Sequence, residues 1–347
     1  MEEELAMIEK NKTWRLVDKS QDRKIIGVKW TPTSHSLFKK WRIFQLDVKT
    51  FSKWFSAGGD LCGATSRFCD KGHEDKVYLL KKALYGLKQA PRAWYNRVDD
   101  HLQGLGFKES LSESTLYVRK SNFDIVIISL YVDDLLVPGS NLELIEEFKI
   151  EMKKEFEMTD LGEMSYFLGI QIQQSQNAVL ICQKKYAKEI LKKFKMEECK
   201  AMNTPMNPKE KLLKDDGSDK VDEGIYKSII GYLMYLIAAR PDILQSASVI
   251  SRFLNCASEM HMKVAKRAIR YVKGALDYGI KFTKCQNFKL QGYSDSDWAG
   301  SADDMKSTSG YCFNFGSGCF SWCSKKKDIV AQSTAEAEFI AATAAAN

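Results

Sequence analysis

Two adjacent aspartates, Asp133 and Asp134, interrupt an apolar run, and no other feature restricts the folding of this chain as strongly. The run IVIISLYVDDLLVPGS extends from Ile125 to Ser140. Its valine, isoleucine, leucine and tyrosine content is typical of strands buried in a sheet. Burying a carboxylate is costly unless it is protonated, paired or bound to a metal ion, and neighbouring carboxylates also repel each other. Two apolar segments flanking a polar pair therefore predict a β-hairpin with the acids at its tip.

Two explanations of this acidic tip remain open from these residues alone. Aspartate is common in turns, so the pair can form a solvated turn without any chemistry. The alternative is a metal site, because Asp47 ends another apolar segment, IFQLDVKT, earlier in the chain. Carboxylates converging from different strands can hold two magnesium ions for nucleotidyl transfer. Because adjacent strand residues point to opposite sides, we expect Asp47 and one of the pair to be the main ligands, with the other assisting.

The composition is that of a globular protein with room for two or three domains. The chain has 347 residues, of which 44% are hydrophobic and 28% are charged. No apolar run approaches the roughly 20 residues that span a bilayer, and the acidic start MEEELAMIEKNKTW is no signal peptide. We therefore expect a cytosolic or nuclear protein without membrane contact. The nine cysteines include no C-x-x-C pair, which favours buried free thiols over a zinc site.

A net charge of +7 is compatible with an anionic partner but does not require one. The segment Lys184–Lys200, KKYAKEILKKFKMEECK, holds seven lysines and has apolar residues at helical spacing. This pattern predicts an amphipathic helix with a cationic outer face. That face is either an ordinary solvated surface or a contact to nucleic-acid phosphates, and the sequence leaves both open.

Several blocks, in the same order along the chain, resemble the Pol polyprotein of copia-type retrotransposons. LYVDDLLVPGS is similar to the Y-x-D-D motif of reverse transcriptases, and QLDVKT to that family's first aspartate motif. KKALYGLKQAPRAWY, DLGEMSYFLGI, YLIAARPDI and AKRAIRYVKGALDYG resemble later blocks. YSDSDWAG, KSTSGYCF, SWCSKKK and STAEAEFIA resemble the start of its RNase H domain. The resemblance covers nearly the whole chain and favours the metal site over the solvated turn.

The resemblance implies an α+β fold in five parts. Residues 1–75 would be a damaged fingers segment with the start of the palm, and residues 76–205 a reverse-transcriptase palm, an antiparallel sheet with helices. A linker over 206–224 would lead to a helical thumb or connection-like region over 225–286. Residues 287–347 would form a truncated RNase H-like α/β domain.

The implied activity is RNA-directed DNA synthesis by two-metal nucleotidyl transfer with Mg²⁺ or Mn²⁺. The implied partners are an RNA template, a DNA or RNA primer and a deoxynucleoside triphosphate, while the oligomeric state stays open. Asp47, Asp133 and Asp134 would be the catalytic metal ligands, and Asp295 and Glu338 metal ligands of the RNase H part. Residues implied to line the nucleotide and template pocket are Tyr131, Leu87, Lys88, Gln89, Ala90 and Pro91. Residues implied to position the primer end are Phe167, Leu168 and Gly169.

Three departures from the family predict an impaired copy. Only Thr31–Phe44 separates GVKW from QLDVKT, where the family has several dozen residues whose cations lie over the triphosphate. Trp54–Cys69 resembles no block of the family, and we expect it to be a frameshifted patch. The chain also ends inside the first helix of the RNase H fold, so we expect no RNase H activity. The alternatives are a non-catalytic remnant that at most binds nucleic acid, or an interaction module formed by the helices of 224–276.

Overall fold

The structure is a computed structural model, and it describes residues 41–48, 61–63, 77–79, 90–111, 113–121, 124–207, 210–283 and 289–346. Most of the predicted damaged segment lies outside these residues, as does the frameshifted patch except for the backbone of 61–63. There, β2 (Leu61–Gly63) pairs antiparallel with β3 (Val77–Leu79). The described residues form a mixed α+β fold with antiparallel sheets, in agreement with the predicted class.

The largest sheet contains six strands in the order β4-β5-β6-β7-β1-β8, and every neighbouring pair is antiparallel. The predicted aspartate hairpin is present as β6 and β7, joined by a two-residue turn. Its continuous apolar run fits strands that are covered on both faces, since β7 is buried from Leu135 to Gly139. The strand bounds are β1 (Arg42–Val48), β4 (Lys108–Ser110), β5 (Glu113–Ser121), β6 (Asp124–Tyr131), β7 (Asp134–Gly139) and β8 (Met158–Glu163).

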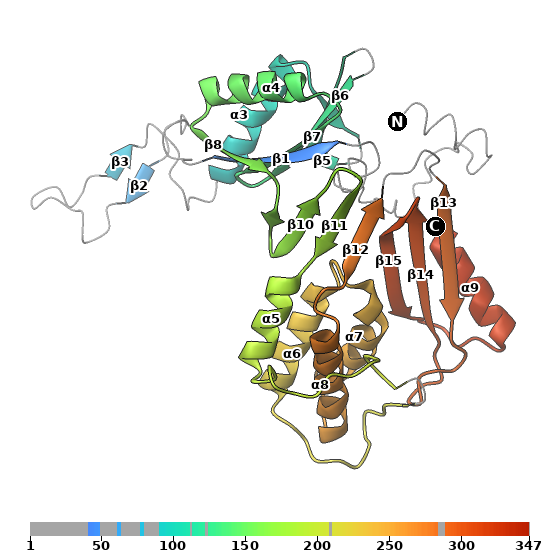
Figure 1. Ribbon diagram of the computed structural model, residues 1–347. Helices are drawn as coiled ribbons and strands as arrows, with labels where there is room; N and C mark the ends of the chain where they lie inside the picture. Colours follow the sequence, from blue (N-terminus) through green and yellow to red (C-terminus); the bar gives the residue numbers. More distant parts are fainter. Residues whose placement is uncertain are drawn as a thin grey trace, which may run out of the picture.

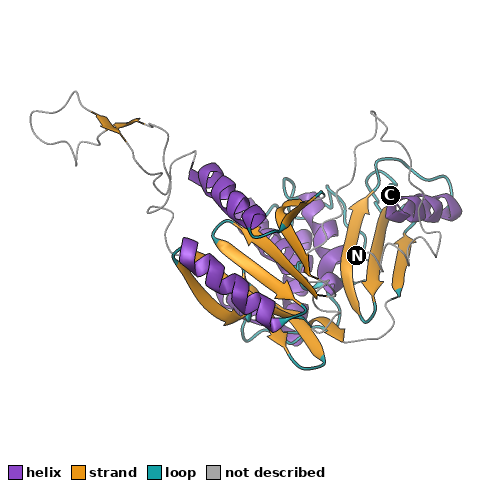
Figure 2. Cartoon of the chain, turned by 90° about the horizontal axis from the view of Figure 1, so that it is seen from above, coloured by secondary structure: helices purple, strands orange, loops and turns teal. Residues whose placement is uncertain are grey.

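Two helices, α3 (Ala90–Gly104) and α4 (Leu142–Glu155), cross one face of this sheet, as Figure 2 shows from above. Apolar residues recur along each helix at the spacing that places them on one side. Asn141 caps the N-terminus of α4, since its side chain accepts a hydrogen bond of 2.8 Å from the amide of Glu143. The residues buried beneath the helices include Trp94, Val98, Leu102, Ile145, Phe148 and Met152.

A second sheet, in the order β12-β11-β10-β9, lies between the large sheet and a cluster of helices (Figure 1). The side-chain amide of Gln174 joins the two sheets in the way a backbone amide would. It accepts from the Ile43 amide at 3.0 Å and donates to the carbonyls of Ile43 at 3.0 Å and Met164 at 2.9 Å. The strands are β9 (Tyr166–Phe167), β10 (Ile170–Gln174), β11 (Ala178–Cys182) and β12 (Gly279–Thr283).

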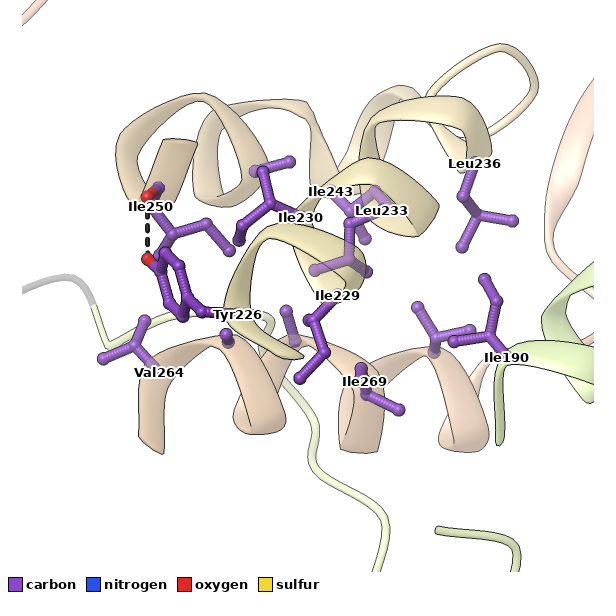
Figure 3. Close-up of a cluster of buried hydrophobic side chains, with 14 of the residues drawn as sticks. Ile190, Tyr226, Ile229, Ile230, Leu233, Leu236, Ile243, Ile250, Val264 and Ile269 are labelled. Atoms are coloured by element: carbon purple, nitrogen blue, oxygen red, sulfur yellow. Dashed lines mark hydrogen bonds between the residues drawn. The ribbon is translucent and has the colours of Figure 1, made fainter. Parts of the chain in front are cut away.

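The helical cluster has its own buried core (Figure 3). The Tyr226 hydroxyl within it donates a hydrogen bond of 2.7 Å to the carbonyl of Ile250, so this buried polar group is satisfied. The cluster contains α5 (Lys184–Lys193), α6 (Glu223–Leu236), α7 (Leu244–Ile250) and α8 (Glu259–Gly274), with short 3₁₀ turns η2 (Pro241–Ile243) and η3 (Ser251–Phe253).

The segment predicted as a linker lies against this cluster where the structure describes it. Leu212 is buried in the helical core. The amide of Val221 donates to the carbonyl of Ala257 at 3.2 Å, and the amide of Glu259 donates to the carbonyl of Asp219 at 2.9 Å. These contacts hold the segment beside the N-terminus of α8. Whether it marks a domain boundary stays a prediction.

A three-stranded sheet and one helix form the C-terminal unit. The strands β13 (Leu290–Ser296), β14 (Thr308–Phe315) and β15 (Gly318–Lys326) pair in chain order, and α9 (Thr334–Ala346) packs against β13 and β14 (Figure 1). At Gly318, a Cβ atom would lie 2.2 Å from the ring of Phe282 on β12. Glycine is therefore needed where this unit meets the second sheet. None of the helices in the described ranges is long and apolar enough to cross a membrane.

A buried arginine ties the chain after α6 to the end of α8. Arg240 is only 2% exposed, and it donates two hydrogen bonds to the Asp242 carboxylate, at 2.8 and 2.7 Å, and one to the carbonyl of Ala275 at 2.8 Å. The hydroxyl of Tyr271 also donates to Asp242. Burial acts to raise the pKa of Asp242, but the hydrogen bonds and charge of Arg240 outweigh it and leave the pKa below its usual value.

Replacing Asp242 with asparagine should leave the buried Arg240 cation uncompensated and lower the free energy of unfolding by about 3 kcal/mol. Glu223→Gln is the matched control, because it removes an exposed ion pair to Lys227 and should cost no more than about 0.5 kcal/mol. Urea denaturation of both variants checks this. Equal losses in the two variants would contradict a special role for the buried pair.

Candidate functional site

Asp47 and Asp134 lie directly opposite each other on neighbouring antiparallel strands, β1 and β7. Such partners point to the same face of a sheet. Their neighbours Leu46 and Leu135 are fully buried in the core beneath α3 and α4. Because side chains alternate along a strand, the two aspartates point to the opposite face, away from that core.

Gln45 shares that face, since it precedes Asp47 by two residues on β1. Its side-chain Nε2 donates a hydrogen bond of 2.9 Å to Oδ1 of Asp134. Gln45 is itself buried, so the amide is held in place by its surroundings. The contact fixes the orientation of the Asp134 carboxylate relative to β1.

The turn between β6 and β7 consists of Val132 and Asp133, since Tyr131 pairs with Asp134. Val132 has a φ of +55°, a conformation that is strained for a β-branched residue. Two hydrogen bonds hold the turn against the rest of the fold. The indole Nε1 of Trp94 on α3 donates to the carbonyl of Val132, and the amide of Val48 donates to the carbonyl of Asp133 at 3.1 Å. The turn that carries Asp133 is thus fastened beside the end of β1.

The three aspartates offer only hard oxygen donors, which suit Mg²⁺. Within the described ranges, no three His, Cys, Asp or Glu side chains are arranged as a group that could hold a metal ion. Mg²⁺ usually takes one or two protein carboxylates and completes its shell with water and substrate phosphates. The opposed pair Asp47 and Asp134, with Asp133 in the adjoining turn, fits that open kind of site and not a closed protein cage.

The structure brings Tyr131 and Phe167 together. The resemblance implied a place in the nucleotide pocket for Tyr131 and a primer-positioning role for Phe167. Their rings meet edge to face with centroids 5.7 Å apart. Leu168 and Gly169 follow Phe167 and form the turn between β9 and β10. Of the other pocket residues, Ala90 and Pro91 begin α3, whereas Leu87, Lys88 and Gln89 lie outside the described residues.

The acids proposed for RNase H chemistry, Asp295 on β13 and Glu338 on α9, are both exposed. Neither carboxylate makes a hydrogen bond or ion pair to another described residue. Their neighbours have structural roles instead: Asp297 accepts from the amide of Thr308 at 2.6 Å, and Glu336 accepts from the amide of Gln332 at 2.7 Å at the start of α9. Among the described residues, Asp295 and Glu338 belong to no group of three or more acidic, histidine or cysteine side chains that could hold a metal ion, and their metal-binding role stays a prediction.

Residues 35–208 match the family described as reverse transcriptase (RNA-dependent DNA polymerase). The chain belongs to this family.

The similar proteins confirm the resemblance of this reverse-transcriptase chain to copia-type Pol polyproteins. It is 36% identical over 302 residues to a retrovirus-related Pol polyprotein from transposon RE1 of Arabidopsis thaliana, covering 87% of the chain and 21% of the relative. It is 37% identical over 282 residues to the corresponding polyprotein from transposon TNT 1-94 of Nicotiana tabacum, covering 78% and 21%. It is 30% identical over 279 residues to a putative transposon Ty5-1 protein of Saccharomyces cerevisiae, covering 80% and 91%. The chain thus spans about a fifth of the length of the Pol polyproteins.

Sequence reasoning missed three residues of this reverse-transcriptase chain that contact the aspartate hairpin or the turn beside it: Gln45, Trp94 and Tyr235. Gln45 and Trp94 lie inside the quoted motif blocks QLDVKT and KKALYGLKQAPRAWY. The alternation of side chains along a strand could have placed Gln45 on the same face as Asp47. Tyr235 also lies inside a quoted block, YLIAARPDI, but no local pattern predicts its contact with the turn between β9 and β10, because that contact joins residues far apart in the sequence.

The strain at Val132 can be tested by substitution with glycine, which adopts positive φ without steric cost. We expect Val132→Gly to be at least as stable as the parent, because Val132 is 58% exposed and little packing is lost. Val330→Gly is the matched control: Val330 is 50% exposed and has no positive φ, so this variant should lose about 1 kcal/mol. Free energies of unfolding from urea titrations distinguish the two, and an equal loss would argue against strain at Val132.

Proposed function

We propose that this chain carries the nucleotidyl-transfer site of an RNA-directed DNA polymerase. The observation that carries the proposal is the placement of Asp47 opposite Asp134 on β1 and β7, with Asp133 in the adjoining turn, in a chain of the reverse transcriptase family. The proposed substrates are a deoxynucleoside triphosphate and a DNA or RNA primer annealed to an RNA template.

The proposed chemistry is attack of the primer 3′ oxygen on the α-phosphorus of the triphosphate, with pyrophosphate as the leaving group. Asp47 and Asp134 would hold Mg²⁺ or Mn²⁺, with Asp133 assisting. Bound metal would supply activation of the hydroxyl and neutralisation of the charge on the phosphates. Gln45 keeps the Asp134 carboxylate oriented through its hydrogen bond. Tyr131 and Phe167 would support the nucleotide and primer beside the acids.

In this proposal, the large sheet with α3 and α4 is the palm, and α5 to α8 form the thumb or connection-like region. The strands β13 to β15 with α9 would be the RNase H-like part. The support is the match of residues 35–208 to the family, together with the order of the motif blocks along the chain.

We further propose that synthesis by this copy is slow, because few residues separate GVKW from QLDVKT. In the family, the longer segment between these two motifs carries cations that would stabilise the transferring phosphates. The competing proposal is a remnant that binds nucleic acid without catalysis. It is supported by the lack of a preformed three-acid group among the described residues and by the lysines of α5.

Primer extension on an annealed RNA template, with Mg²⁺ or Mn²⁺, tests the proposed function. We expect the parent to incorporate nucleotides, and Asp133→Asn combined with Asp134→Asn to lower the rate by about a hundredfold or more through loss of charge stabilisation. The control is Asp124→Asn. Asp124 lies at the far end of the same hairpin, where it accepts from Ser140 and Asn141, so its loss should leave the rate unchanged.

Binding of the primer–template, measured at several salt concentrations, separates the two proposals. Contacts to phosphates make affinity fall steeply with salt, and this should hold for the parent and the double variant alike. A parent that binds in this way but never extends the primer would leave only the non-catalytic proposal.

A further inference from the structure

A continuous set of contacts connects the aspartate hairpin to the helical cluster. Tyr131, which precedes the turn with Asp133, packs edge-on against Phe167 at the end of β9. The residue after Phe167 is Leu168, and its carbonyl accepts a hydrogen bond from the hydroxyl of Tyr235 on α6. The contacts therefore lead from the aspartate hairpin, through the turn between β9 and β10, to α6 of the helical cluster.

The turn that receives Tyr235 has an unusual conformation. Phe167 and Ile170 pair across it, so Leu168 and Gly169 are its two central residues, with φ angles of +46° and +76°. A two-residue turn of this kind favours asparagine or glycine at both positions, and leucine is costly there. A Cβ atom on Gly169 would lie 2.9 Å from the hydroxyl oxygen of Tyr235. Both central residues of the turn are thus in direct contact with this side chain.

Tyr235 is itself fixed within the helical cluster. Its ring packs against Tyr186 on α5, with centroids 4.8 Å apart. Its carbonyl accepts a hydrogen bond of 3.3 Å from the buried side chain of Gln183. Contacts with Tyr186 and Gln183 therefore hold the Tyr235 side chain in place, with its hydroxyl directed at the turn.

We propose that Tyr235 is a positioning residue for the polymerase site. Its hydroxyl holds the Leu168–Gly169 turn in its strained conformation, and this turn sets Phe167 against Tyr131 beside the aspartates. The placement of α6 in the helical cluster thereby fixes the placement of Phe167, beside which a primer end would lie. This inference deepens the proposed function and rests on it.

The test is Tyr235→Phe in the full chain, which removes the hydroxyl and keeps the ring contact with Tyr186. We expect single-turnover nucleotide incorporation to fall about fivefold, the effect of one lost hydrogen bond, with the primer–template Kd unchanged. The matched control is Tyr232→Phe, one turn earlier on α6. The Tyr232 hydroxyl contacts Lys193 at 2.7 Å and its ring also packs on Tyr186, so its loss should leave incorporation unchanged. Equal effects of the two substitutions, or none from Tyr235→Phe, would overturn the inference.

A double-mutant cycle adds a readout that general destabilisation would not reproduce. Gly169→Ala places a methyl group against the Tyr235 hydroxyl oxygen, and that oxygen is absent in Tyr235→Phe. We expect Gly169→Ala to slow incorporation less in the Tyr235→Phe background than in the parent. Strictly additive effects would show that the two residues act independently and would contradict the inference.

Hydrogen exchange separates failure of this inference from failure of the proposed function. If the parent extends no primer, the polymerase proposal fails, but the contact can still be measured from the backbone amides of residues 166–170. Faster exchange there in Tyr235→Phe, and not in Tyr232→Phe, would show that Tyr235 positions the turn. Unchanged exchange in both variants would overturn that role as well.

Discussion

The antiparallel register between β1 and β7 is the constraint on which the rest of the structure depends. It places Asp47 opposite Asp134 and Leu46 opposite Leu135, so one face of the pair carries carboxylates and the other enters the core. A shift of one residue in either strand would turn the aspartate of that strand toward α3 and α4 and its leucine toward the opposite face. Burying a carboxylate in this apolar core is more costly than the loss of a single core contact, so the register and the site are specified together.

Much of the local structure could be predicted because its signals are local. The aspartate hairpin followed from apolar runs around a polar pair, and the amphipathic helix predicted in Lys184–Lys200 followed from apolar spacing and is present as α5 (Lys184–Lys193). The α+β class and the family also emerged from the sequence. The division into parts and the metal-binding roles stay predictions.

The remaining features depend on contacts between residues that are distant in the sequence. Nothing in the sequence around Gln174 indicates that its amide would join Ile43 of β1 to Met164, and nothing around Arg240 indicates that it would be buried. The positive φ of Leu168 runs against the preferences of leucine, and it is tolerated because Tyr235 and the strand pairing impose it. Prediction from sequence patterns relies on the conformational preference of each residue. At these positions, contacts with residues distant in the sequence determine the conformation instead.

The pairing of β11 with β12 makes the helical cluster an insertion in the second sheet. Cys182 and Gly279 are direct partners, so the chain leaves the sheet after β11 and returns beside the same point once α5 to α8 are complete. The approach is close, since a Cβ atom on Gly279 would lie 2.2 Å from the carbonyl oxygen of Ile181. A segment whose two ends lie side by side, such as the one holding α5 to α8, can fold as a unit without threading through the rest of the chain. Both covalent connections of the cluster to the second sheet therefore lie side by side, so a change at the Cys182–Gly279 pair would reach α5 and α8 together.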